Sequence, residues 1–399
     1  MKPVLEDVSV IDLSTFVTGG FSSLMLAAQG ADVIKIERPD VGDDIRHSGP
    51  PFINGESPYY WTVNYDKRSV ELDLKTEPGK TALYDLVEAA DVVIQNFRPG
   101  TADRLDIAYD DLTTYNDNII YCDISAFGNT GPWSERPGYD LLVQGLSGIM
   151  SVTGEAERSP VKVGLPQTDL ITAMWAAFGI MGALYRRERT NEGEYIELGM
   201  LDATLPWLTK QAGKVFADET PERMGTQDPV LAPYQTLETA DGYINIACLN
   251  EKLWQALCDA IERPDLSEDE RFETNADRVK NMDALTKELE TAVSKRTTDE
   301  WMTVFIEAGV PAGPVQTIAD ALSNEQTDAR GMIDTIIDDE REIPVIEHPL
   351  NFKHAQSGFD GPPPKLGEHT DEVFAELGYT EQRLERLRKK GVFGNDDPE

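Results

Sequence analysis

Cysteine and histidine are both scarce in this 399-residue chain, which has three of the former and four of the latter. Cys122, Cys248 and Cys258 include no close pair, so neither a disulfide framework nor a zinc knuckle is expected. The histidines form no H-E-x-x-H motif and no other ligand-like pair. Metal chemistry therefore has no support in the sequence.

The chain also lacks the motifs of several common enzyme classes. No G-x-S-x-G nucleophile elbow is present, and the first glycine turn reads VTGGFSS instead of the dinucleotide-binding G-x-G-x-x-G. Gly79-Lys80-Thr81 is similar to the end of a P-loop, but Leu74 stands where that loop needs its first glycine. The covalent chemistry left open is that of a carboxylate.

Long hydrophobic runs are missing as well. No uninterrupted apolar stretch approaches the roughly 20 residues that a membrane-spanning helix needs. The first residues, MKPVLEDVSVIDL, run directly into a strand pattern and lack the basic-then-apolar build of a signal peptide. We therefore expect a soluble, cytoplasmic protein that does not enter membranes.

Positive charge is in short supply. The 36 lysines and arginines face 72 aspartates and glutamates, which leaves a net charge of −36. So much like charge repels itself in dilute buffer, whereas at molar salt the Debye length falls to about 3 Å and the repulsion is screened. Because hydrophobic residues make up 40% of the chain, disorder is a poor explanation. The balance favours a halophilic protein and argues against a nucleic-acid partner.

Strand and helix patterns alternate through the first half of the chain. Apolar strand patterns, with helical patterns between them, recur at residues 8–13, 31–37, 69–74, 91–97 and 118–125. Such alternation predicts a doubly wound, Rossmann-like parallel sheet with helices on both faces. Ligands of such sheets bind at the carboxyl ends of the strands.

The pattern changes near residue 226. A hairpin pattern with Asp241-Gly242 as its turn is followed by helical segments and a Pro/Gly-rich break at 309–317. Residues 340–366 have the composition of an extended strap, and residues 376–392 that of a terminal helix. We expect four segments: a large α/β domain at 1–200 that the C-terminal 330–399 segment completes, a linker at 201–225, a small α+β domain at 226–330, and a return linker with the terminal helix at 331–399.

Asp169 stands at the start of a long apolar helix, in VGLPQTDLITAMWAAFGIMGALYRRE. A carboxylate in the first turn of a helix lies among free backbone N–H groups at the positive end of the helix dipole, which keeps it ionised. An ionised, positioned carboxylate can attack an activated acyl group. On spacing alone, a simple helix-stabilising role for Asp169 is the better interpretation.

Sequence segments spread over most of the chain resemble those of the family III CoA-transferases. The family includes formyl-CoA:oxalate, carnitine and dicarboxylate CoA-transferases, together with the related α-methylacyl-CoA racemases. The resemblance lies in VIDLSTFVTGG, GADVIKIERPDVGDDIR, NYDKRSVELDLKTEPGK, DVVIQNFRPGTADRL, SAFGNTGPWSERPGYDLLVQGLSGIMSVTG, VGLPQTDL, RTNEGEYIELGMLDA, PYQTLETADGY, GVPAGPVQT and PPPKLGEHT.

This resemblance implies a CoA-transferase in which Asp169 is the nucleophile. Asp169 would attack the donor thioester to form an aspartyl-acyl anhydride, and the released CoA thiolate would convert it into an aspartyl-CoA thioester. Coenzyme A then enters as part of the substrate, with no permanently bound cofactor. The implied partners are acyl-CoA, small carboxylic acids and a second copy of the chain, because the family fold is an interlocked homodimer.

Four basic residues lie at or just beyond the carboxyl ends of expected strands, where an anionic cofactor would bind. They are Arg38, Lys75, Arg98 and Arg104. Taken singly, each of these residues could equally be a solvated basic residue on the surface. The resemblance implies that Arg38, Lys75 and Arg104 hold the nucleotide and phosphates of CoA, and that Val17, Thr18, Leu72, Asn96 and Phe97 line its path.

Tyr139 argues against a racemase. The racemases of this superfamily move a proton with a histidine in a Gly-His-Asp segment, which here reads Gly138-Tyr139-Asp140. A phenol with a pKa of about 10 is a poor general base at neutral pH. No histidine lies between His47 and His348 to replace it. Tyr139 is instead expected to shape the acyl pocket or to pack in the core.

Two departures from the family pattern make oxalate a poor candidate for the acceptor. Val17 stands where the oxalate enzymes have a glutamine, and residues 247–254 lack their run of glycines. The sequence as a whole is more similar to those of transferases that move CoA from succinyl-CoA to mesaconate or malate. A dicarboxylate needs a cation at its distal end, for which Arg46 and Arg136 are the candidates. Racemisation, transfer between two carboxyls of one acid, and CoA binding without turnover remain alternatives.

The charge balance makes a direct prediction about salt. In dilute buffer the protein should unfold or lose activity. At molar potassium chloride it should regain its folded structure and its activity, because only then is the self-repulsion screened. Far-ultraviolet circular dichroism and activity, measured across a salt titration, check this. Full structure and activity in dilute buffer would count against a halophilic protein.

Overall fold

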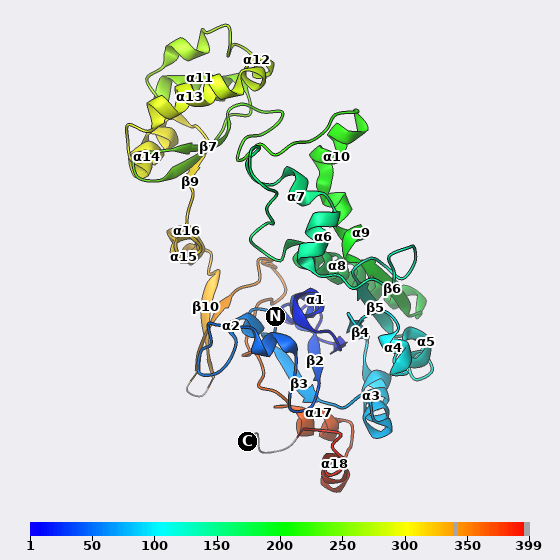
Figure 1. The fold of residues 1–399 in the computed structure, drawn as a ribbon. Coiled ribbons are helices and arrows are strands. Elements are labelled where there is room, and N and C mark those ends of the chain that lie inside the picture. Colours follow the sequence, from blue (N-terminus) through cyan, green and yellow to red (C-terminus); the bar gives the residue numbers. More distant parts are fainter. Residues whose placement is uncertain (339–340, 395–399) are drawn as a thin grey trace. The chain divides into compact units, whose positions relative to one another are not determined.

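The computed structural model describes residues 1–338 and 341–394 and divides the chain into two compact units (Figure 1). Unit 1 contains Met1–Ser147, Val163–Lys210 and the C-terminal segment from Gln326. Unit 2 contains Gly148–Lys162 and Gln211–Glu325. The chain therefore leaves unit 1 and returns to it twice.

A six-stranded parallel sheet forms the centre of unit 1, as the alternating pattern predicts. Its strand order is β3-β2-β1-β4-β5-β6, so the chain runs outward in one direction and then in the other. The sixth strand is absent from the sequence-based expectation, because Glu194 and Glu197 interrupt its apolar pattern. The strands are β1 (Ser9–Asp12), β2 (Asp32–Glu37), β3 (Lys67–Glu71), β4 (Val92–Gln95), β5 (Ile120–Ser125) and β6 (Glu194–Gly199).

Apolar side chains of the strands pack alternately on the two faces of this sheet. Val10 faces α1 (Phe16–Ala27) and α8 (Gln167–Thr190), whereas its neighbour Ile11 faces α3 (Glu77–Ala89) and the C-terminal α17 (Thr370–Glu376). Strands covered on both faces need this continuous apolar character. The C-terminal segment thus completes the core of unit 1.

Helix α8 carries Asp169 and is unusually apolar. Among residues 1–338 and 341–394 it alone has the length and composition of a membrane span, and half of that stretch is buried inside the chain. α8 packs closely against α1. α1 itself lies so near the preceding turn that a Cβ atom at Gly19 would stand 2.1 Å from the Cβ of Ser14, so only glycine fits there.

The C-terminal region differs from the single terminal helix expected at 376–392. α17 ends before Gly378, which has a φ of +82°, and the Thr380 side chain then caps a second helix, α18 (Glu381–Arg388). The expected strap at 340–366 begins with a strand of a β-hairpin, β10 (Ile333–Asp338) and β11 (Arg341–Ile346). Residue 340 of the expected strap and the last residues, 395–399, lie outside the described residues.

The remaining elements of unit 1 are short. They are α2 (Pro58–Trp61), α4 (Thr101–Arg104), α5 (Tyr109–Leu112), α6 (Asp140–Leu146), α9 (Met200–Thr204) and the 3₁₀ helices Asp44–His47 and Leu205–Leu208, while α10 (Thr209–Phe216) and α16 (Glu325–Ala329) lie at the boundaries with unit 2.

Unit 2 combines an antiparallel sheet with helices. The predicted hairpin is confirmed: β7 (Tyr234–Glu238) pairs with β8 (Tyr243–Ala247), and Thr239 and Gly242 close the turn. The expected break at 309–317 contributes a third strand, β9 (Ala312–Pro314). The other elements are α7 (Ile149–Val152), α11 (Glu251–Ala260), α12 (Asn275–Lys280), α13 (Met282–Val293), α14 (Thr298–Ala308), α15 (Ile318–Ser323) and the 3₁₀ helix Pro264–Ser267.

All three cysteines of the chain are buried and unbridged. Cys122 belongs to the core beneath α8, and Cys248 and Cys258 belong to the core of unit 2. Burial raises the pKa of each thiol to about 12. These thiols therefore stay protonated and act as small apolar side chains.

Candidate active site

Asp169 is the third residue of α8 and approaches α1 through a hydrogen bond. The Thr18 hydroxyl, which is buried near the start of α1, donates to Asp169 Oδ1. Asp169 Oδ2 has no hydrogen-bond partner within residues 1–338 and 341–394. One oxygen of the carboxylate is thus held in place by a hydrogen bond, while the other makes none within the described residues.

The pKa of the Asp169 carboxyl is raised to about 6. Burial is the largest cause, because it disfavours the charged form, and the negative charge of Asp140 acts in the same direction. The hydrogen bond from Thr18 acts in the opposite direction. The expectation that the helix start favours the ionised form is thus corrected, because burial outweighs it and raises the pKa; at a pKa of about 6 the carboxyl is still mostly ionised at pH 7.

A buried ion pair holds the turn that precedes Thr18. Lys35 Nζ lies 2.9 Å from Asp43 Oδ2, both side chains being almost fully buried, and donates to the Ser14 carbonyl oxygen at 2.9 Å. Asp43 Oδ1 accepts from the backbone N–H of Phe16 at 3.0 Å. Phe16 has a φ of +58°, an unfavourable conformation for a residue with a side chain, so this bond stabilises a strained start of α1.

The residues expected along the CoA path fall into two groups. Val17 and Leu72 are core residues, with 4% and 2% of their surface exposed, so they shape the fold beneath the surface. Asn96 donates to the carbonyl oxygen of Thr15 at 2.8 Å and accepts from its N–H at 2.9 Å, which ties the end of β4 to the turn before α1. Phe97 is half-buried beside the core.

The four expected cations all lie beyond carboxyl ends of the sheet strands or in the short helix that follows. Lys75, Arg98 and Arg104 are exposed. Arg38 is half-exposed, but it donates to the carbonyl oxygen of Gly42 at 2.9 Å and pairs with Asp44 at 2.6 Å. It therefore also stabilises the loop that carries Asp43.

The geometry of Arg46 speaks against the expected contact with the distal carboxylate of a substrate. Its guanidinium is largely buried, bonds Glu37 through two contacts of 2.7 and 2.6 Å, and stacks 3.8 Å over the ring of Tyr60. It also donates to the Pro364 carbonyl oxygen at 3.1 Å. Arg46 is thus committed to a buried ion pair that fastens the C-terminal strap, which no local sequence pattern reveals.

Arg136 and Tyr139 remain accessible. Arg136 is exposed and lies 5.0 Å over the ring of Trp133, so its charge is available to a ligand. Tyr139 precedes α6 and is 59% exposed, which excludes the expectation that it packs in the core of this unit. Tyr59, which the sequence does not single out, lies near Asp169: burial and the charge of Asp169 raise the pKa of Tyr59.

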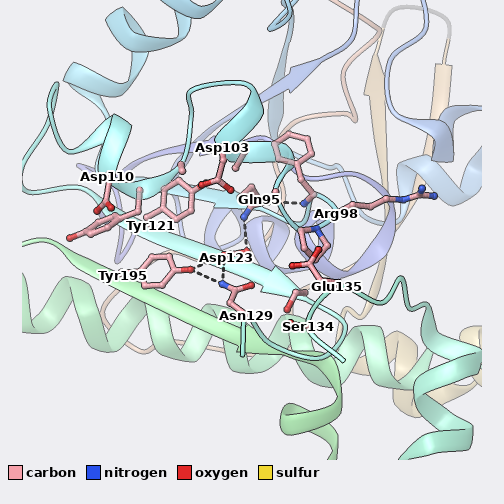
Figure 2. Close-up of a pocket in the computed structure, with 17 residues that line it drawn as sticks. Gln95, Arg98, Asp103, Asp110, Tyr121, Asp123, Asn129, Ser134, Glu135 and Tyr195 are labelled. Atoms are coloured by element: carbon pink, nitrogen blue, oxygen red, sulfur yellow. Dashed lines mark hydrogen bonds between the residues drawn. The ribbon is translucent and has the colours of Figure 1, made fainter. Parts of the chain in front are cut away.

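A cavity of about 440 Å³ opens beside Phe97 and Arg98, over β5 and β6 (Figure 2). Asp123 at its floor accepts hydrogen bonds from Gln95, Asn129 and Tyr195. Its lining includes four carboxylates, and its one cation, Arg98, extends away from the other labelled side chains. Such a lining repels phosphates, so the cavity does not suit the phosphates of CoA. The lining carboxylates are Asp103, Asp110, Asp123 and Glu135.

Comparison with known proteins identifies the family. Residues 5–370 match the model of CoA-transferase family III. The chain belongs to the family III CoA-transferases. This enzyme is 36% identical to the succinate–glutarate CoA-transferase of Agrobacterium fabrum, over 94% of its own length and 96% of the relative. It is 37% identical to the succinyl-CoA:mesaconate CoA-transferase of Haloarcula hispanica, with the same coverage.

The fold is similar to that of a solved family member. A CAIB/BAIF family protein from Brucella suis superimposes with a TM-score of 0.87 at 39% sequence identity, covering 94% of the enzyme and 100% of that chain. The mixed α/β fold expected from the sequence is thus confirmed.

Sequence reasoning missed the residues that hold this site together. Lys35 carries a signal in hindsight, because it is the one positively charged residue of the strand DVIKIE and stands between the apolar residues Ile34 and Ile36. Asp43 carries none, since its partner comes from another element. Asp140 stands out only as part of the Gly-Tyr-Asp segment, and Gln144 carries no local signal at all.

The Thr18 hydroxyl should set the pH dependence of the enzyme. Thr18→Val removes a hydrogen bond to the ionised form of Asp169, so the pKa of that carboxyl should rise further above 6. A bond to a charged group is worth about 1.5–3 kcal/mol, so the acidic limb of the kcat/KM profile should move up by about one to two pH units.

Thr18→Ser is the matched control, because it keeps the donor and should leave the limb in place. An unshifted limb in Thr18→Val would show that the hydroxyl does not control the ionisation of Asp169.

Proposed function

We propose that this enzyme moves CoA from succinyl-CoA to a dicarboxylic acid such as mesaconate or malate, with Asp169 as the covalent nucleophile. Asp169 Oδ2 attacks the thioester carbonyl carbon, the C–S bond breaks, and CoA leaves as a thiolate. The product of this step is an aspartyl-succinyl anhydride.

Three further transfers complete the cycle. The CoA thiolate attacks the aspartyl carbonyl and releases succinate, which leaves an aspartyl-CoA thioester. The acceptor carboxylate then attacks this thioester, forms a new anhydride and expels the thiolate again. The thiolate finally attacks the acceptor carbonyl and restores the free Asp169 carboxylate. Each step exchanges one activated acyl bond for another, so no other co-reactant is needed.

The observation that carries the proposal is the setting of Asp169. Its carboxylate is held at Oδ1 by the Thr18 hydroxyl and is partly withdrawn from water, yet it is mostly charged at neutral pH. A desolvated carboxylate is a stronger nucleophile than a hydrated one, and limited water access protects the anhydride from hydrolysis.

The carboxyl edge of the sheet is the proposed CoA site. Arg38, Lys75, Arg98 and Arg104 follow β2, β3 and β4, whose carboxyl ends lie side by side with that of β1 in the parallel sheet. Their positive charge opposes the strongly acidic balance of the chain at the place where the phosphates would lie. Arg136, rather than Arg46, is the proposed partner of the distal carboxylate of the acceptor.

The names of the two curated relatives support succinyl-CoA as donor and a dicarboxylate as acceptor. A racemase is disfavoured because Tyr139 stands in place of the catalytic histidine. The strongly acidic composition supports a working environment rich in salt, in the cytoplasm.

We also propose that the enzyme is a homodimer, as its family resemblance implies. Met174, Phe178 and Tyr185 follow one another at helical spacing on α8, and 50%, 72% and 65% of their surfaces are exposed. Leu141 and Leu142 of the neighbouring α6 are half-exposed too. A contiguous apolar surface of this kind marks an interface in a soluble protein.

Light scattering at high salt should give twice the 44.3 kDa mass of the chain. Phe178→Asp should lower the melting temperature of the interlocked dimer, because it places a charge in the apolar face. A monomeric wild-type enzyme would overturn this assembly.

The nucleophile and the substrates are tested together by mass analysis of acyl-CoA products. Succinyl-CoA is offered at high salt with mesaconate, malate, glutarate and oxalate in turn. The wild-type enzyme should form one new dicarboxyl-CoA with little free CoA, and hydroxylamine should trap an aspartyl hydroxamate at Asp169. Asp169→Ala should lose transfer by at least about 10³-fold while still binding CoA, since it removes the nucleophile.

Asp299→Ala is the control, because Asp299 is an exposed aspartate in the first turn of another helix, α14. Full activity in Asp169→Ala would refute covalent catalysis at this position. Free CoA as the main product would indicate hydrolysis, and an unchanged mixture would direct the search to racemisation.

A further inference from the structure

We propose that Gln144, through Asp140, is a positioning residue that fixes the Asp169 carboxylate for attack. The proposal rests on Asp169 being the nucleophile. It concerns the segment Val163–Thr168, which delivers Asp169 to the site, and its contact with α6.

Gln144 is fully buried on α6, and its amide bonds in two directions. Its Oε1 accepts from the backbone N–H of Val163 at 2.8 Å, and its Nε2 donates to the carbonyl oxygen of Leu165 at 3.3 Å. The same Nε2 donates to Asp140 Oδ2 at 2.7 Å, one helical turn earlier. A single side chain thus clamps the delivery segment and orients a carboxylate.

Asp140 uses its other oxygen to cap α8. Its Oδ1 accepts from the backbone N–H of Thr168 at 2.8 Å and from the Thr168 hydroxyl at 2.9 Å. α8 needs this external cap, because the residue before the helix is Pro166, whose side chain cannot accept a hydrogen bond. Asp169 is the next residue after Thr168, so its position follows from the cap.

Chemistry determines the direction of every hydrogen bond in this network. The Asp140 carboxylate can only accept, the backbone N–H groups of Val163 and Thr168 can only donate, and the Gln144 amide must match both sides. Gln144→Glu places two carboxylates against each other at the 2.7 Å contact. Asp140→Asn sets an N–H group against either Thr168 or the Gln144 amide. Each single change breaks the pattern.

The double variant D140N/Q144E restores the pattern with donor and acceptor exchanged. The new amide at position 140 then donates to the new carboxylate at position 144, while the acceptors facing Thr168 and Val163 are retained. The bond to the Leu165 carbonyl oxygen, the longest of the Gln144 bonds, is lost, and two acceptors face each other there at about the original 3.3 Å. Restored function in the double variant would therefore report this particular hydrogen-bond network, and not merely tolerance of the site.

The experiment compares Gln144→Glu, Asp140→Asn and the double variant at high salt, by steady-state kinetics with succinyl-CoA and by hydroxylamine trapping at Asp169. Each single variant should lose kcat by about tenfold to a hundredfold with KM within about twofold, because a displacement of about 1 Å at a nucleophile costs up to 10²-fold. Trapping should fall in parallel. The double variant should recover kcat to within about threefold of wild type.

The matched control is Q255E/D259N and its single variants. Gln255 and Asp259 form the same amide-to-carboxylate pair one turn apart on α11, but the pair is exposed and holds no other segment. These variants should leave kcat unchanged.

Three results would overturn the proposal. They are unchanged kcat in both folded single variants, a folded double variant with less than about one-tenth of wild-type kcat, or a double variant that fails to fold when the singles do fold. If the single variants do not fold, the kcat of the double variant tests the proposal by the same limit of about one-tenth of the wild-type value. A purely structural role predicts a lower melting temperature with unchanged kcat, and Asp169→Ala separates failure of this proposal from failure of the covalent mechanism.

Discussion

The buried ion pair between Lys35 and Asp43 is the constraint on which the site depends. It stabilises the turn in which Phe16 adopts a positive φ, and this turn places Thr18 against Asp169. Two charges without water need each other, since losing one partner of such a pair costs about 3–5 kcal/mol. The ion pair therefore holds the turn in place and, with it, the Thr18 hydroxyl beside Asp169.

A second set of contacts fixes the other side of the Thr18–Asp169 bond. α8 brings Asp169 from a distant part of the chain, and its first turn is capped from α6 instead of by its own residues. The carboxylate lies where two independently anchored elements meet. Burial raises the pKa of the carboxyl, and the hydrogen bond from Thr18 opposes that rise. With a pKa of about 6, the carboxyl is still mostly ionised at neutral pH, as the proposed role of nucleophile requires.

The sequence predicts the parallel sheet, the hairpin of unit 2 and the helix that carries Asp169, because each depends on local periodicity. It does not predict the edge strand β6, because two glutamates interrupt its apolar pattern. It also does not predict that the terminal helix is divided at Gly378. Arg46 illustrates the limit most clearly. In the sequence Arg46 is only a cation near the end of a strand. The fold shows that its guanidinium is hydrogen-bonded to Glu37 and to a carbonyl group from a distant part of the chain. Pairings between remote residues carry no local pattern.

The three buried thiols have a consequence for an enzyme that handles acyl-CoA. Thioesters such as acyl-CoA acylate accessible thiolates, so an enzyme that acts on them is exposed to acylation of its own cysteines. Here each thiol is withdrawn into a core, and its pKa of about 12 leaves almost none of it ionised. The three cysteines therefore offer no accessible thiolate to an activated acyl group.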